Sequence, residues 1–315
     1  MRAVRAHDRI VEVVDVPAPS GDGVRVRIRS AGICGSDLHL VDSGFALGKT
    51  LGHEMAGVTP DGTAVAIEPI LPCGRCANCT SGAYNLCDLG PGTVMGVAHD
   101  GGMAEEVVVP ARCLVPLHPA IPVANASLVE PLAVVVHGLR RARLRGGERV
   151  AVIGGGSIGL CSVIAARAAG AHVDLVARHD AQREAGARLG AGEPSGTYDL
   201  VIDAAGTKSA LETALPLCRP GARLLLVATY WGGLELPGFA LCMKEVDVIP
   251  ASMYGRDGAS RDVDVAAAIL ARQPEAADVL ITHRFPLDAA REAFAVASNR
   301  ASGAIKVVLE PNGRA

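Results

Sequence analysis

The sequence has few aromatic residues and no run of basic ones. Its 315 residues include four Phe, four Tyr and one Trp, and the formal net charge is −3. Proteins whose main partner is nucleic acid usually carry a basic patch or stripe, so we expect no nucleic-acid partner. Half of the residues are hydrophobic and no segment is of low complexity, which excludes a disordered chain.

Long hydrophobic segments are also lacking. Residues 150–166 contain no charged side chain, but this segment is shorter than a membrane-spanning helix requires and contains three consecutive glycines. The N-terminal residues lack the apolar stretch and the small-residue cleavage site of a secretory signal. We therefore expect a soluble, cytoplasmic protein without a membrane partner.

The first 130 residues predict short strands separated by turns. Residues 24–32 alternate apolar and polar side chains, as a half-buried strand does. Shorter strands are expected at 63–67 and 104–109, and Thr-Pro-Asp-Gly at 59–62 predicts a turn.

After Glu130, predicted strands alternate with predicted helices. The expected strands are 149–153, 173–177, 199–204 and 222–228. The expected helices are 157–169, 180–189 and one that starts near Thr207. This alternation is typical of βαβ units with a parallel sheet. The last part of the chain departs from it, with an expected helix at 287–297 and an expected strand at 305–310.

A glycine-rich turn matches the dinucleotide-binding pattern G-x-G-x-x-G over Gly154, Gly155, Gly156, Ser157, Ile158 and Gly159. It lies between a predicted strand and a predicted helix, the context in which this pattern binds phosphates. Gly154 permits the tight turn, Gly156 lets the backbone approach a pyrophosphate, and Gly159 allows the helix to pack on the strand. The alternative is a glycine-rich turn without a ligand.

The end of the next predicted strand favours NADP over NAD. Folds that bind NAD place a carboxylate there, about 20 residues further on, to bind the ribose 2′-hydroxyl. Here that position holds Ala177, and Arg178 follows with a guanidinium suited to a 2′-phosphate. The alternative is that Arg178 is a solvated surface cation and that NAD is used.

Four of the nine cysteines lie within fifteen residues: Cys73, Cys76, Cys79 and Cys87. Without a secretory signal, such a cluster indicates metal binding rather than disulfides. Four thiolates at these spacings suit one tetrahedral Zn²⁺ with no open position, which is a structural site. Unligated thiols and an iron–sulfur cluster are the alternatives.

A second set of potential metal ligands is dispersed in the same part of the chain. Its members are Cys34, His53, Glu54 and Glu130. Each alone has an ordinary interpretation, as a buried thiol, a core histidine or a surface carboxylate. Together they offer a mixed-ligand zinc site that keeps a position open for substrate.

The order of these motifs resembles that of the zinc-dependent medium-chain alcohol dehydrogenase family. The resemblance covers nearly the whole chain. It rests on the four-cysteine segment, the glycine-rich turn, Cys34-Gly-Ser-Asp-x-His39, Gly52-His53-Glu54 and Glu130-Pro131-Leu132-Ala133. The last of these motifs resembles the one found in the polyol, threonine and sorbitol dehydrogenase branch of the family.

The resemblance implies an α/β fold with two domains. A mainly β, GroES-like catalytic domain would comprise residues 1–130 and 253–315, with a structural zinc lobe at about 72–88. A Rossmann domain with a doubly wound parallel sheet would occupy residues 131–252. The family also implies a homodimer or homotetramer.

The resemblance also implies roles for single residues in catalysis. Cys34 and His53 would bind the catalytic zinc, and Glu54 and Glu130 would be further ligands.

Other implied roles concern protons and the cofactor. Ser36 would relay the alcohol proton by way of the cofactor ribose to His39, and Asp37 would orient His53. Lys306 would bind the cofactor pyrophosphate.

The implied activity is reversible hydride transfer between an alcohol, such as a secondary alcohol or polyol, and NADP or NAD, with two zinc ions per chain. A zinc-free quinone or enone reductase of the same superfamily and a non-catalytic nucleotide-binding protein are the alternatives. Segments 40–49, 57–65 and 192–198 are shorter than in the family, although no proposed ligand is lost.

Overall fold

A computed structural model describes residues 1–44 and 48–313, and only the backbone at position 300. Part of the shortened segment 40–49, residues 45–47, therefore lies outside the described residues. The chain forms two compact units. The first combines Met1–Glu130 with Gly255–Ala315, and the second is Pro131–Tyr254.

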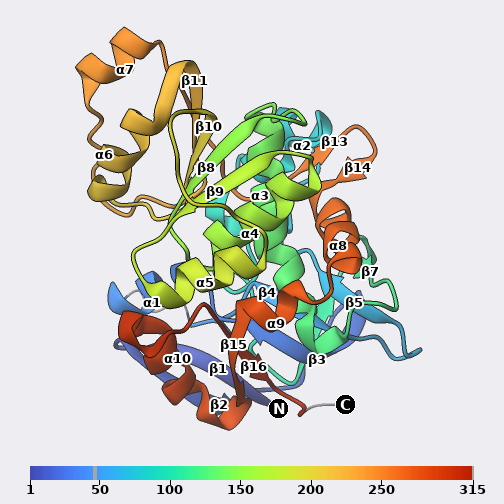
Figure 1. Ribbon diagram of the computed structural model, residues 1–315. Helices are drawn as coiled ribbons and strands as arrows, with labels where there is room; N and C mark the ends of the chain where they lie inside the picture. The colour runs from blue at the N-terminus through green and yellow to red at the C-terminus, as the bar shows by residue number, and fades with distance from the viewer. Residues whose placement is uncertain (45–47, 314–315) are drawn as a thin grey trace. The chain divides into compact units, whose positions relative to one another are not determined.

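The first unit is built on a seven-stranded sheet made from both ends of the chain (Figure 1). The strand order is β15-β16-β3-β4-β5-β7, and β6 also pairs with β3. The strand bounds are β3 Val24–Gly32, β4 Glu54–Val58, β5 Ala64–Ile67, β6 Glu106–Val109, β7 Leu114–Pro116, β15 Ile281–Pro286 and β16 Lys306–Glu310. A separate hairpin consists of β1 (Arg2–His7) and β2 (Ile10–Asp15).

The alternating pattern of residues 24–32 is confirmed by the burial of β3. Val26 and Ile28 are fully buried, whereas Arg25 and Arg27, which alternate with them, are exposed. The turn predicted at 59–62 joins β4 to β5, and Gly62 adopts a φ of +89° there. The pairing of β4 with β3 places Glu54 beside the end of β3.

Helices cover this sheet or connect its parts. Their bounds are α1 Gly35–Asp42, α2 Ala77–Thr80, α8 Asp262–Arg272, α9 Ala276–Leu280 and α10 Ala290–Ser298. A short hairpin, β13 (Arg256–Asp257) and β14 (Ser260–Arg261), precedes α8. The helix predicted at 287–297 starts later than expected because a 3₁₀ turn at Leu287–Ala289 forms its beginning, as is common at helix ends.

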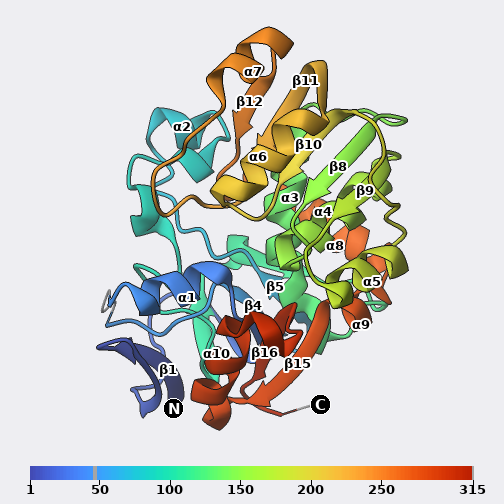
Figure 2. The ribbon, with the colours of Figure 1, turned by 60° about the vertical axis from the view of Figure 1, so that its left-hand side comes forward.

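The second unit contains a five-stranded parallel sheet in the order β12-β11-β10-β8-β9 (Figure 2). The strand bounds are β8 Arg149–Ile153, β9 His172–Val176, β10 Tyr198–Asp203, β11 Cys218–Leu226 and β12 Asp247–Pro250. The helix bounds are α3 Val129–Arg141, α4 Ser157–Ala168, α5 Asp180–Arg188, α6 Lys208–Leu217 and α7 Gly238–Lys244. The predicted βαβ alternation is confirmed, and the order reverses between β8 and β10, where doubly wound folds bind their ligands.

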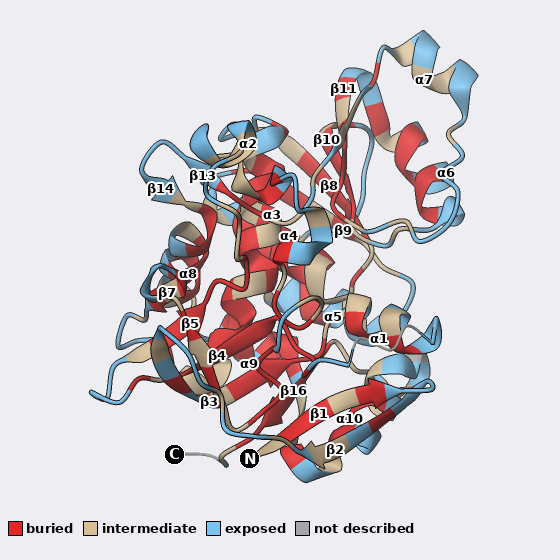
Figure 3. Ribbon diagram, turned by 180° about the vertical axis from the view of Figure 1, so that it is seen from behind, coloured by how far each residue is buried: buried red, intermediate tan, exposed pale blue. Residues whose placement is uncertain are grey.

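The uncharged segment at 150–166 is explained by this sheet. Its first residues belong to the buried strand β8, and its last ones to α4, whose inner face is buried as well (Figure 3). Within the part of the chain that the structure describes, no helix is long and apolar enough to cross a membrane.

Candidate active site

Three of the predicted catalytic-zinc ligands converge in the first unit. Cys34 follows β3 and precedes the first turn of α1, while His53 and Glu54 lie at the start of β4. One ligand atom from each of the three lies within 4.8 Å of the others. The antiparallel pairing of β3 with β4, which sets Gly32 opposite Glu54, brings the two segments together.

Two glycines make room for this convergence. A Cβ on Gly32 would lie 2.0 Å from Glu54 Oε2, so no other residue fits opposite this carboxylate. Gly52, directly before His53, has a φ of +95°, and a Cβ there would lie 2.6 Å from Met103 Cγ. The glycine of the Gly-His-Glu motif is therefore required by backbone conformation and by space.

The structure pairs Glu54 with Lys306. The Lys306 ammonium lies 2.6 Å from both Glu54 carboxylate oxygens and donates to the Ile33 carbonyl at 3.1 Å. Lys306 is 3% exposed and Glu54 is fully buried. Sequence reasoning assigned Lys306 to the cofactor pyrophosphate and missed this ion pair, for which the sequence carries no local signal.

Asp37 faces the Nδ1 side of the His53 ring. Asp37 Oδ1 and His53 Nδ1 lie 3.6 Å apart, and neither atom has another hydrogen-bond partner among the described residues. Burial alone would lower the pKa of His53, but Asp37 and then Cys34 outweigh burial and raise it well above its usual value. A carboxylate in this position fixes the ring orientation of a metal-binding histidine.

The proposed proton relay begins beside the same ring. Ser36 Oγ lies 3.3 Å from His53 Nε2. His39 is on the same helix, α1, three residues further on, and is exposed to solvent. Glu130 in α3 is not among the three converging ligands, but it is near enough to His53 to contribute to its raised pKa.

This donor set fits zinc. It combines sulfur, nitrogen and oxygen donors, and Zn²⁺ binds all three types at roughly 2.0–2.3 Å. Two buried atoms that have no hydrogen-bond partner in the described part of the chain, Asp37 Oδ1 and His53 Nδ1, face each other beside it, as in sites where a carboxylate supports a zinc-bound imidazole.

The four clustered cysteines converge as a second group. One sulfur from each lies within 4.8 Å of the others, and the Sγ atoms of Cys73 and Cys79 are 3.8 Å apart. Two thiolates on one tetrahedral zinc would be about 3.8 Å apart, given Zn–S bonds near 2.3 Å. Backbone N–H groups of Arg75 and Cys76 lower the pKa of the Cys73 thiol to about 6. The residues thus fit a structural zinc ion.

A partly buried network that sequence reasoning missed anchors this lobe. The hydroxyl of Tyr84, between the third and fourth cysteines, donates to Glu68, which also contacts Arg261 Nη1 at 3.3 Å. Burial and the Glu68 carboxylate raise the pKa of Tyr84, so that its hydroxyl stays a donor. Arg261 also donates to the carbonyl of Arg112 at 2.7 Å.

The glycine-rich turn in the second unit has the geometry of a phosphate-binding loop. Gly154 has a φ of +105°, and a Cβ on Gly159 would lie 1.8 Å from the Gly154 carbonyl oxygen. A Cβ on Gly156 would meet no atom within 4 Å, so this side of the turn is open. The helix start has no side-chain cap, and the buried Ser157 hydroxyl has no partner among the described residues. These free donors fit a pyrophosphate.

The turn after β9 presents one uncommitted arginine. Arg178 is exposed, and its guanidinium forms no hydrogen bond or ion pair within residues 1–44 and 48–313. Arg183 is instead engaged: it donates to the carbonyls of Ala177 at 2.9 Å and Arg178 at 3.0 Å, and it pairs with Asp180. The predicted NADP determinant is thus free to bind an anion, while its neighbour fixes the turn.

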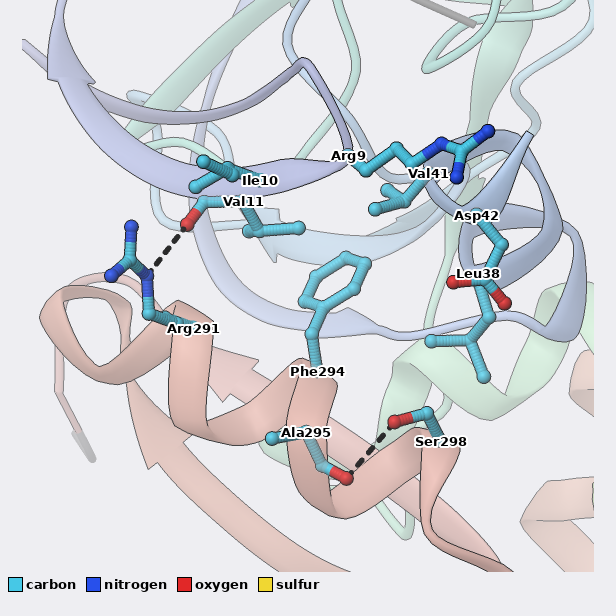
Figure 4. A pocket seen from close by; sticks show the side chains of 10 residues that line it. All are labelled: Arg9, Ile10, Val11, Leu38, Val41, Asp42, Arg291, Phe294, Ala295 and Ser298. Atoms are coloured by element: carbon cyan, nitrogen blue, oxygen red, sulfur yellow. Dashed lines mark hydrogen bonds between the residues drawn. The ribbon is translucent and has the colours of Figure 1, made fainter. Parts of the chain in front are cut away.

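A pocket of about 330 Å³ lies elsewhere in the first unit, between the β1–β2 hairpin, α1 and α10 (Figure 4). Phe294, Val11 and Val41 form its apolar part, and Arg9 and Arg291 lie at its rim. None of the predicted metal, relay or cofactor residues lines it. It is therefore distinct from the candidate active site.

Two family models match most of the chain. The model described as "Alcohol dehydrogenase GroES-like domain" matches residues 20–119, and "Zinc-binding dehydrogenase" matches residues 157–272. The first covers the converging ligands and the cysteine lobe, and the second covers the parallel sheet from α4 onwards.

Individual relatives agree with these matches. The chain is 30% identical to an L-galactonate-5-dehydrogenase from Escherichia coli over 89% of both chains. Galactitol-1-phosphate dehydrogenase from Escherichia coli superposes with a TM-score of 0.88 at 28% identity, covering 99% of this chain and 100% of the other. A zinc-binding dehydrogenase from Sinorhizobium meliloti, bound to NADP, superposes with a TM-score of 0.85 at 28% identity over 98% and 99% of the two chains.

Proposed function

The chain belongs to the zinc-dependent medium-chain alcohol dehydrogenase family, and from this premise we propose that it interconverts a secondary alcohol or polyol and its ketone, with NADP as the preferred cofactor. The observation that carries the proposal is the convergence of Cys34, His53 and Glu54 beside Ser36 in one compact unit. A zinc-free reductase or a binding protein would not need thiol, imidazole and carboxylate donors at one point. Relatives that act on galactonate and galactitol 1-phosphate support a polyhydroxy substrate.

The chemistry divides between the bound groups and the residues of the chain. Bound zinc supplies a Lewis acid for the alcohol oxygen, and bound NAD(P) supplies the hydride acceptor. Cys34 and His53 hold the metal, with Glu54 and Glu130 as further ligands, and Asp37 keeps the His53 ring in place. The cysteines at 73, 76, 79 and 87 hold a second, structural zinc ion.

The proposed proton path uses two side chains of α1, Ser36 and His39. Ser36 Oγ accepts the alcohol proton as it gives up its own hydroxyl proton, and His39, which is exposed to solvent one turn further along the helix, releases a proton to water. Such a path is needed because the metal-binding histidine and its carboxylate partner are both buried.

The cofactor is bound by the second unit. Residues 131–252 form the cofactor domain, and residues 1–130 with 253–315 form the catalytic domain. Gly154, Gly156, Ser157, Ile158 and Gly159 bind the pyrophosphate. The turn at Ala177 and Arg178 binds the 2′-phosphate, and Lys306 is a further proposed pyrophosphate ligand from the catalytic domain.

We further propose that the protein is a homodimer or homotetramer. Four large apolar side chains in one segment of the second unit are exposed: Trp231, Leu234, Phe239 and Met243. Two of them lie on α7, whose only cation, Lys244, donates to backbone carbonyls at the end of α6 and just beyond it. The adjacent β12 is an end strand of its sheet. An apolar surface next to a sheet edge suits contact with a second copy. Sedimentation equilibrium measures the oligomeric state.

The test of the proposed activity is a set of initial rates with polyols, secondary alcohols and ketones, each with NADP(H) and NAD(H). We expect turnover of at least one polyol or secondary alcohol and a higher kcat/KM with NADP. Arg178→Ala should lower kcat/KM for NADP about tenfold or more, because a charge-assisted bond to the phosphate is lost, and should leave NAD almost unchanged. Ala177→Asp should reverse the preference by repelling the phosphate.

Arg188→Ala, which removes an exposed arginine at the other end of α5, is the matched control. A wild-type preference for NAD, or equal losses with both cofactors in Arg178→Ala, would contradict the assignment of the 2′-phosphate site. Absence of turnover with both cofactors across the whole set would contradict the proposed function.

Ser36→Ala should lower kcat by about 10²–10⁴-fold, the usual contribution of a general acid–base group. Cofactor affinity should hardly change, because the hydroxyl lies beside His53 in the first unit. His39→Ala should cost less, since water can replace an exposed outer relay. Steady-state rates and fluorescence titration with NADPH measure the two effects. Ser36→Ala with wild-type kcat would rule out the relay.

A further inference from the structure

Asp203 links separate backbone segments at the carboxyl end of the parallel sheet. It is the last residue of β10 and is fully buried. Its Oδ1 accepts hydrogen bonds from the N–H groups of Ala205 at 2.9 Å and Gly206 at 3.1 Å. Its Oδ2 accepts a hydrogen bond from the hydroxyl of Tyr230, which lies beyond the end of β11. One carboxylate therefore holds the loop after β10 and the loop after β11.

The same two loops are also in direct contact. The carbonyl oxygen of Asp203 accepts hydrogen bonds from the N–H groups of Val227 at 3.1 Å and Ala228 at 3.2 Å. Gly206 has a φ of +66°, and a Cβ there would lie 3.1 Å from the carbonyl oxygen of Thr229. The backbone of one loop thus packs against the backbone of the other.

The loop after β10 borders the glycine-rich turn on its other side. Asp203 is in register with Ile153, the residue before the turn, and Ala204 N donates to the Ile153 carbonyl at 2.9 Å. A Cβ on Gly154 would lie 3.1 Å from the Cβ of Ala205. β8, β10 and β11 are neighbours in the sheet, so the turn and both loops form one continuous edge (Figure 2).

The chemistry of Tyr230 suits a fixed donor. Its ring packs against the apolar cluster that contains Leu211 and Leu226. Burial and then the Asp203 carboxylate raise the pKa of Tyr230, so its hydroxyl stays protonated and donates to the carboxylate.

A dinucleotide on a doubly wound sheet lies across the carboxyl ends of the strands, with one mononucleotide half on each side of the switch point. β8 and β9 serve the adenine half, where Ala177 and Arg178 lie. We propose that Asp203 and Tyr230 are positioning residues for the other, nicotinamide half. Their hydrogen bond holds the loops after β10 and β11 in place beside the glycine-rich turn, so that the nicotinamide half fits between the turn and the loops. The inference rests on the proposed use of NAD(P).

The experiment compares a whole dinucleotide with its adenine half. Tyr230→Phe keeps the ring and removes only the hydroxyl. We expect the dissociation constant of NADPH to rise roughly tenfold, the usual effect of losing a hydrogen bond to a charged group. Adenosine 2′,5′-bisphosphate, which has no nicotinamide half, should bind Tyr230→Phe as it binds the wild type. Calorimetry measures both, and energy transfer from Trp231, the chain's single tryptophan, to NADPH gives a second readout.

The matched control is Tyr198→Phe. Tyr198 lies at the opposite end of β10, and its hydroxyl donates to Asp174 at 2.8 Å. Tyr198→Phe therefore also removes a tyrosine hydroxyl that donates to an aspartate of the sheet, but far from the proposed nicotinamide site. NADPH binding should be unchanged in this variant. An equal loss for NADPH and the bisphosphate in Tyr230→Phe, or an equal loss in both tyrosine variants, would show a merely structural role and overturn the inference.

The same measurements with NADH and AMP keep this test separate from the choice of cofactor. If the wild type binds NADH rather than NADPH, the NADP assignment fails, and the contrast between NADH and AMP in Tyr230→Phe decides the inference. If the wild type binds neither dinucleotide, the proposed function and the inference both fail. If it binds one and Tyr230→Phe binds it equally well, only the inference fails.

Discussion

Cys34→Ala is expected to remove one of two zinc ions and to lower kcat by about 10³-fold or more, while the protein stays folded. Cys34 supplies the thiolate of the converging ligand set, and loss of the Lewis acid costs several kcal/mol of transition-state stabilisation. The fold should persist because Cys34 lies between β3 and α1 and is only half-buried. Elemental analysis of the purified protein and initial rates measure both effects.

Cys76→Ala should lower stability more than it lowers kcat. It removes a ligand of the cysteine lobe, so the lost metal is one whose binding contributes directly to folding. We expect a lower midpoint of thermal unfolding and retention of the other zinc ion. Cys242→Ala, at an exposed cysteine outside both groups, is the control and should change neither metal content nor kcat. An active wild type with one zinc ion or none would contradict the assignment of two sites.

Lys306→Met should destabilise the protein by about 3–5 kcal/mol, the usual cost of breaking a buried ion pair on one side. The substitution removes the ammonium that lies 2.6 Å from both oxygens of the fully buried Glu54 carboxylate. Denaturant unfolding of the zinc-loaded protein, followed by circular dichroism, measures the loss.

A second substitution tests the cause. Adding Glu54→Gln to Lys306→Met removes the buried charge and should recover much of the lost stability, because a neutral amide costs less to bury than an unpaired carboxylate. A Lys306→Met protein with wild-type stability and weakened binding of NADPH would instead favour Lys306 as a pyrophosphate ligand alone.

The sequence predicted the second unit well because its signals are local. β8 has the predicted bounds, and α4 and α5 each begin at the predicted residue. In a buried parallel sheet, short β-branched runs and glycine turns are set by neighbouring residues. The end of β11 was less predictable: the strand stops at Leu226, two residues before the predicted end, and the N–H groups of Val227 and Ala228 both donate to the Asp203 carbonyl, a contact between different segments.

The candidate site likewise has features that the sequence predicted and features that it did not. Short spacings such as Cys73 to Cys76 and Cys34 to Asp37 carry their own geometric information, since a few residues cannot separate the side chains far. Sequence alone therefore determined which donor groups the protein owns and how they are ordered. It did not determine the partner of Glu54, which is 252 residues away in the chain.

That partner was decided by the tertiary structure. β16 from the C-terminal end pairs with one part of β3, and β4 pairs with the same strand on its other side, which places Lys306 and Glu54 together. The link between Asp203 and Tyr230 likewise depends on the register of β10 with β11. A sequence pattern records the preferences of the local backbone and the chemistry of each side chain. Contacts across a sheet depend instead on strand order and register, which arise only when the whole core packs.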